Sequence, residues 1–132
     1  MNSVQLLGRL TKDPEMRINN SSKTAMVRFS IAVDKQLSRE QKKEFEANNK
    51  PTADFINCVA WGGTAEAIAK YTAKGNRIMV QGRIQTGSYQ ADDGSKRYTT
   101  DIVVVNVDFI DWKDNQESNS DYTPVNDYRI PF

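Results

Sequence analysis

The sequence predicts an all-β fold, a small barrel of five main strands with one short helix between the third and fourth strands. Two patterns support this prediction. Apolar and polar residues alternate along several runs, and each run is closed by Gly, Pro, Asn or Asp. Between the third and fourth main strands, one further run has its apolar residues at helical spacing.

The first half of the chain has three of the main strands and one short one. The main strands are expected over residues 3–10, 25–34 and 53–61. A short strand over residues 16–18 leads into a polar turn before the second main strand. The alternation is clearest in the second main strand, where Val27, Phe29 and Ile31 are apolar and Arg28 and Ser30 are polar. A period of two gives such a strand one core-facing side and one outward side.

A long polar interval over residues 35–51 separates the second and third main strands. Ser38 and Gln41 have the spacing of a capping box, in which each side chain bonds the other residue's backbone N–H at the start of a helix. A mobile hairpin flap fits the same composition. The sequence does not decide between a short helix and a hairpin flap in this interval.

The second half of the chain completes the barrel. A helix is expected over residues 64–75, with Gly75 as its C-terminal cap, followed by a strand over 77–90. Gly82 and Gly87 within that strand indicate a bulge or bend. A turn at Asp93-Gly94 leads into the last strand, over residues 97–112. Five main strands with a helix between the third and fourth form the OB-fold, a five-stranded Greek-key barrel.

The chain divides into a domain over residues 1–112 and a tail over residues 113–132. The domain contains 16 Lys or Arg and 13 Asp or Glu, whereas the tail contains 2 and 4. The tail is also rich in Asn, Asp and Ser and poor in apolar residues, so we expect it to be disordered. A weakly basic body can attract a polyanion to one surface.

Composition argues against enzymes and metal sites. The 132 residues include no His and one Cys, so the commonest general base and the usual zinc ligands are missing. Asp92 and Asp93 fit a hairpin turn better than a metal pair. We therefore expect no cofactor, no metal and no catalysis. We expect no signal peptide and no membrane span, and because one Cys allows no internal disulfide we expect a cytoplasmic protein.

Aromatic residues in two strands are the candidate binding groups. In the third strand, Ile56, Cys58 and Ala60 are small and apolar and face the interior, which turns Phe55 and Trp61 outward. These two rings are about 20 Å apart along the strand. Tyr89 has the outward parity of the fourth strand and adds a third ring. Single-stranded nucleic acids bind by stacking bases on such rings while cations follow the phosphates.

Basic residues near these strands are candidates for phosphate contact. They are Arg28, Lys35, Arg39, Lys42, Lys43, Lys50, Lys74 and Arg83. Other interpretations stay open from the residues alone, because strand aromatics also pack in cores and mixed charges also form solvated faces. An RNA-binding module and a protein–protein adaptor both fit the same pattern. Nuclease chemistry is a more distant alternative.

The order of these segments resembles the bacterial and phage single-stranded DNA-binding protein family over essentially the whole chain. The opening that reaches GRL and then DPE is similar, as is the central block TADFINCVAWGGTAEAIAKYTAKGNRIMVQGRIQTGSYQ. The last strand, RYTTDIVVVNV, and the carboxyl-terminal IPF also resemble that family.

The resemblance implies an OB-fold that assembles as a homotetramer with single-stranded DNA wrapped over its outer surface. It implies that the protein coats such DNA during replication, recombination and repair. Phe55, Trp61 and Tyr89 match the family's base-stacking positions, and Lys74 matches a basic one. The resemblance also implies that replication and repair proteins dock on the tip formed by Ile130, Pro131 and Phe132.

Two departures from the family pattern predict weaker or more salt-sensitive binding. Gln85, Gly87 and Ser88 occupy a segment of the fourth strand that is often richer in arginine in the family. Leu37 is nearest to the position of a stacking aromatic that is common at the end of the second strand.

Overall fold

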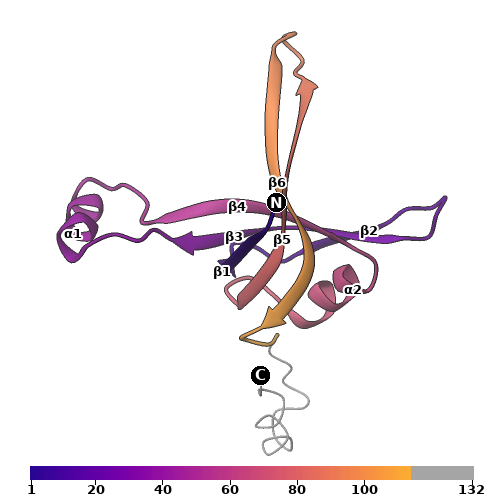
Figure 1. The fold of residues 1–132 in the computed structure, drawn as a ribbon, viewed down its shortest axis with the longest axis horizontal. Helices are drawn as coiled ribbons and strands as arrows, with labels where there is room; N and C mark the ends of the chain where they lie inside the picture. Colours follow the sequence, from indigo (N-terminus) through magenta and orange to yellow (C-terminus); the bar gives the residue numbers. More distant parts are fainter. Residues whose placement is uncertain (114–132) are drawn as a thin grey trace, which may run out of the picture.

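A computed structural model describes residues 1–113 of the chain (Figure 1). Its elements, in order, are β1 (Val4–Leu10), β2 (Glu15–Ile18), β3 (Ala25–Asp34), α1 (Arg39–Ala47), β4 (Ala53–Trp61), α2 (Gly62–Tyr71), β5 (Arg77–Gln90) and β6 (Lys96–Phe109). The predicted disordered tail, including Ile130, Pro131 and Phe132, lies outside the described residues from position 114 onward.

The strands form one sheet that closes on itself. Their order is β1-β5-β6-β4-β3-β2, and an additional pairing of β1 with β3 closes the barrel. All the pairings are antiparallel except that of β4 with β6, which is parallel and short. A Greek-key barrel of five main strands, with β2 as a short addition at one edge, confirms the predicted OB-fold.

The barrel interior is filled by the apolar side of each alternating strand. In β3, Val27, Phe29 and Ile31 are buried and Arg28 is exposed, as the period of two predicts. Helix α2 contributes Ala65 and Ile68 to the same core. The other core residues are Leu10, Ala25, Cys58, Ala60, Ile78, Val80, Ile102 and Val104.

The polar interval between β3 and β4 contains a second helix, so the expectation of a single helix is corrected to two among the described residues. At the start of α1, the Gln41 N–H donates to Ser38 Oγ (3.1 Å) and the Ser38 N–H donates to Gln41 Oε1 (3.0 Å). This capping box decides between the two alternatives in favour of the helix.

Helix α2 is also shifted from its predicted range. It begins at Gly62 and ends at Tyr71, where the Thr72 N–H donates to Ile68 O (3.1 Å). The buried Thr72 hydroxyl donates to the same oxygen (2.6 Å), and the extended backbone of Thr72 (φ −124°, ψ 155°) ends the helix before Gly75. Gly75 is therefore not the C-cap. It takes a φ of 89° in the following turn, and its N–H donates to Leu10 O (2.8 Å).

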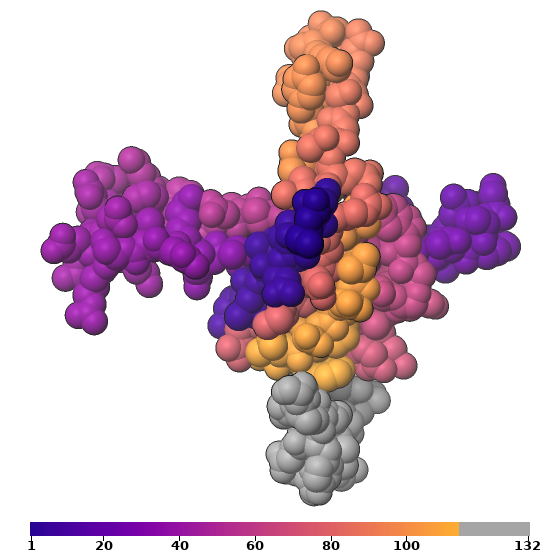
Figure 2. All heavy atoms as spheres, viewed as in Figure 1, coloured from indigo at the N-terminus to yellow at the C-terminus, as the bar shows by residue number. Residues whose placement is uncertain are grey.

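Three arms project from the barrel (Figures 1 and 2). The β5–β6 hairpin rises to the top of both views, the α1 segment extends to the left, and the β2–β3 hairpin extends to the right. Ile84 has the same parity in β5 as the buried Ile78 and Val80. It is 44% exposed, because it lies where the β5–β6 hairpin leaves the barrel.

A bulge marks the transition from barrel to hairpin. The β5–β6 register changes between Gln81, opposite Asn106, and Gly82, opposite Val104, which leaves Val105 as the extra residue of β6. The predicted irregularity at Gly82 is confirmed. The extra residue raises the local twist and lets the hairpin leave the barrel wall.

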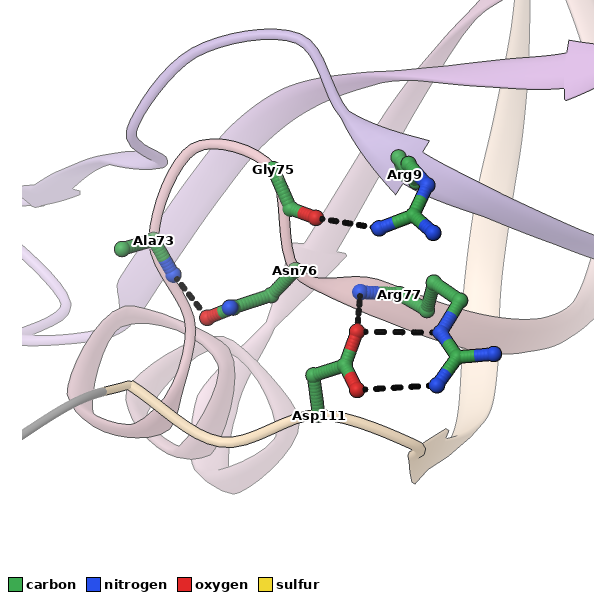
Figure 3. A network of polar contacts seen from close by, with 6 residues as sticks. All are labelled: Arg9, Ala73, Gly75, Asn76, Arg77 and Asp111. Carbon is green, nitrogen blue, oxygen red and sulfur yellow. Dashed lines mark hydrogen bonds and ion pairs between the residues drawn. The ribbon is translucent and has the colours of Figure 1, made fainter.

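The base of β5 is held by a compact polar network (Figure 3). The Asp111 carboxylate accepts from Arg77 Nε (3.0 Å), Arg77 Nη2 (3.1 Å) and the Arg77 backbone N–H (2.9 Å). These hydrogen bonds from Arg77 lower the pKa of Asp111 below its ordinary value. Arg9 donates to Gly75 O nearby (3.0 Å). The network joins the chain just after the end of β6 to the first residue of β5.

Candidate nucleic-acid interface

The outer face of β4 is the centre of the candidate interface. Phe55 is 62% exposed and Trp61 is 43% exposed, whereas Cys58 and Ala60 are buried in the barrel. Asn57 lies exposed between the two rings. One strand therefore presents two aromatic side chains to solvent, with a polar side chain between them, over a small apolar interior.

Val59 shares the parity of Phe55 and Trp61 but is buried, at 4% exposure. It lies opposite Val103 at the parallel junction of β4 and β6, and Val103 is buried as well. The two valines make the floor of the outer face at this junction. Parity alone places Val59 outward but does not show that β6 runs alongside it.

Trp61 occupies the end of β4 and the N-cap position of α2. Its ring lines a hollow of about 430 Å³ together with Arg17, Ile18, Thr24 and Met26 of the β2–β3 hairpin. The ring is thus partly exposed at the wall of a concavity.

The β5–β6 hairpin carries two further exposed tyrosines. Tyr89 is 58% exposed opposite Arg97, and Tyr98 is 77% exposed opposite Ser88. Because directly opposed residues share a face, the two tyrosines point to opposite faces of the hairpin. The Lys96 Nζ atom lies 5.6 Å from the centre of the Tyr98 ring.

Tyr98 is a candidate residue that the sequence pattern does not reveal. It has the parity of Ile102 and Val104, which are buried, so alternation alone places it toward the interior. Two features of the sequence could have indicated Tyr98 as a binding residue. Its ring follows Lys96 and Arg97, and it comes just after the Asp93-Gly94 turn, where a hairpin can extend past the barrel.

The predicted cations are distributed over the body and its arms. Arg28 lies opposite Val59 on the β4 side of β3, between the levels of Phe55 and Trp61. The structure therefore brings Arg28, Phe55 and Trp61 together on one face. Arg83 lies on β5 opposite Val103, where its Nη1 donates to Gln85 Oε1 (3.1 Å).

The other candidate cations are less close to that face. Lys35 is ion-paired with Asp54, which partly neutralises it. Lys42 and Lys43 lie on α1, in the projecting arm to the left of Figure 1. Lys74 lies in the loop between α2 and β5, where its backbone N–H donates to Asp13 Oδ1 (2.8 Å).

Cys58 has no nucleophilic character. Burial, with a smaller contribution from the Asp101 carboxylate, raises the pKa of its thiol to about 12. The thiol therefore stays protonated at neutral pH. Within residues 1–113, no three His, Cys, Asp or Glu side chains are grouped as metal ligands.

Residues 1–110 match the single-strand binding protein family. The chain belongs to this family. Among its relatives, the single-stranded DNA-binding protein of Clostridium perfringens is 42% identical, and the alignment covers the whole of both chains. Single-stranded DNA-binding protein 2 of Clostridium acetobutylicum is 43% identical, again over the whole of both. That of Fusobacterium nucleatum is 47% identical over 79% of this chain and 62% of its own.

Membership of the single-strand binding protein family confirms the resemblance seen in the sequence and places the chain among binding proteins rather than enzymes. The family match covers both the β4 face and the β5–β6 hairpin. No helix within residues 1–113 is long and apolar enough to span a membrane.

Proposed function

We propose that this protein binds single-stranded DNA on the outer face of β4, with bases stacked on Phe55 and Trp61. The observation that carries the proposal is the pair of exposed rings on one strand face with Arg28 beside them. Base stacking contributes about 1–3 kcal/mol per ring and tolerates any sequence, because every base has a π-face. Binding is therefore largely independent of sequence.

The β5–β6 hairpin extends this surface. Tyr89 gives a third stacking platform, and Arg83 lies at the base of the same hairpin face. Lys74, Lys42, Lys43 and Lys35 are secondary phosphate contacts in the proposal, and Lys35 is the weakest because Asp54 already pairs with it.

The biological role that we propose is to coat and protect exposed single strands during DNA replication, recombination and repair, in the cytoplasm. Residues 1–112 form the binding domain and residues 113–132 the tail. In this proposal the Ile130-Pro131-Phe132 tip recruits replication and repair proteins. The tail contains four acidic and two basic residues, so its net charge does not favour binding to DNA phosphates.

A homotetramer with DNA wrapped around it completes the proposal. Leu7 of β1 and Met79 of β5 lie directly opposite each other and are 49% and 37% exposed. Val105, the extra residue of the β6 bulge, is also exposed. Exposed apolar side chains on a barrel wall favour subunit association.

Competition between DNA and RNA tests this function. A labelled oligo-dT is bound and followed by fluorescence anisotropy, and unlabelled DNA and RNA of one sequence compete for the protein at several salt concentrations. We expect the DNA to compete better, and log affinity to fall against log salt with a slope of about −0.7 for each phosphate neutralised. Preferential competition by the RNA favours an RNA-binding module. Absence of any binding contradicts the proposal and favours a protein–protein adaptor.

A further inference from the structure

A polar hollow of about 590 Å³ lies where the β5–β6 hairpin meets the sheet formed by β3 and β4. Phe29 and Cys58 are among its lining residues, although their side chains belong to the barrel core and are almost fully buried. Its walls are formed by Arg28, Ser30 and Asn57 on one side and Tyr98, Thr99, Thr100 and Asp101 on the other, and Lys12 and Glu15 also line it. A hollow of this volume with a few polar groups along it is large enough for a small planar ligand.

The hollow lies next to the proposed DNA surface. Asn57 is on the outer face of β4 between Phe55 and Trp61, and Arg28 is on the neighbouring strand. The exposed Tyr98 ring is part of the opposite wall. A strand bound along β4 as proposed above would pass the opening, where one of its bases could turn into the hollow.

The wall groups have unused hydrogen-bonding capacity. Within residues 1–113, the side chains of Asn57, Arg28 and Asp101 make no hydrogen bond or ion pair with another side chain. Glu15 also lines the hollow, but Lys12 pairs with it (3.2 Å). Asp101 is thus the carboxylate of the hollow that is left without a cation.

A free carboxylate in this position disfavours phosphate and favours a base edge. An ionised carboxylate only accepts hydrogen bonds, and in nucleic-acid recognition it accepts from the exocyclic amino group of cytosine. The Asn57 amide and the Arg28 guanidinium supply donors for the N3 and O2 acceptors of the same edge. Thymine presents an oxygen where cytosine has its amino group, so the Asp101 carboxylate repels it.

We propose that this hollow takes one base of the bound strand and prefers a base with an exocyclic amino group, with cytosine favoured over thymine through Asp101. The inference rests on the proposed single-strand binding and adds a local base preference to it. The stacking rings remain indifferent to sequence, so the preference is confined to one base position per protomer.

Asp101→Asn is the direct test, measured as the ratio of affinities for oligo-dC and oligo-dT of equal length at pH 7.5. The amide keeps the shape of the side chain, removes its charge and can donate to the thymine oxygen. We expect the variant to lower the dC-to-dT ratio about five-fold or more relative to the unchanged protein. Asn57→Ala is expected to lower the ratio as well.

Asp108→Asn is the matched control, because Asp108 is an exposed acid of β6 that does not line the hollow. It removes the same charge and is expected to leave the ratio unchanged. If Asp101→Asn raises affinity for both oligonucleotides equally, Asp101 acts only as a charge and the inference is overturned. If no variant binds either oligonucleotide, the proposed function itself fails, which is a different result.

Discussion

Replacing Trp61 with alanine is expected to weaken binding of single-stranded DNA about 10- to 100-fold, with the fold intact. This range follows from about 1–3 kcal/mol per stacked base and 1.4 kcal/mol for each factor of ten. The ring is 43% exposed at the end of β4, on the same face as Phe55. Anisotropy of a labelled oligo-dT measures the affinity, and circular dichroism checks the fold.

Two variants make that result specific. Trp61→Phe keeps an aromatic face and is expected to retain most of the affinity. Trp112→Phe changes the other tryptophan, whose ring contacts Tyr71 (5.3 Å between ring centres) and Phe109 (5.2 Å), and is expected to bind normally. Unchanged affinity in a folded Trp61→Ala protein would show that this ring packs against the β2–β3 hairpin instead of stacking on DNA.

Gly82→Ala is expected to destabilise the barrel by about 3 kcal/mol or more, above the ordinary cost of overpacking. A Cβ atom at position 82 overlaps the Val103 carbonyl oxygen and lies 3.0 Å from the Val104 Cα. Both neighbours are backbone atoms of β6 at the bulge, so neither moves without breaking the β5–β6 pairing. Urea denaturation followed by circular dichroism gives the free energy of unfolding.

Gly63→Ala is the control for that substitution. Its added Cβ meets no atom within 4 Å, and Gly63 lies in the first turn of α2, where alanine is the better helix former. We expect this variant to be as stable as the unchanged protein or slightly more so. A Gly82→Ala protein of equal stability would mean that the bulge relaxes freely, against the close packing described for β5 and β6.

Alternation along β4 is enough to predict much of the candidate site. The small apolar side chains of Cys58 and Ala60 suit only the interior, and the period of two then turns Phe55 and Trp61 outward, where both are exposed. Glycine at position 82 is equally informative, because a strand interior rarely has one without a bulge or a close backbone contact.

Features that depend on distant segments could not be predicted in the same way. Ile84 and Tyr98 have inward parity, but the β5–β6 hairpin leaves the barrel before it reaches them. The charge of Lys35 is paired because β4 places Asp54 beside it. The predicted end of α2 was wrong because the helix closes at Thr72, whose N–H and hydroxyl both donate to Ile68 O, and not at Gly75. Each outcome depends on a specific contact and not on the local pattern of residue types.

The most direct test of single-strand binding on the β4 face is the fluorescence of Trp61 during titration with oligo-dT. In the Trp112→Phe protein, Trp61 is the single tryptophan, so the signal reports this one position. We predict quenching that saturates at a fixed ratio of nucleotides to protein and partly reverses at high salt. Unquenched fluorescence, together with no binding by anisotropy, would contradict the assignment of this face to single-stranded DNA.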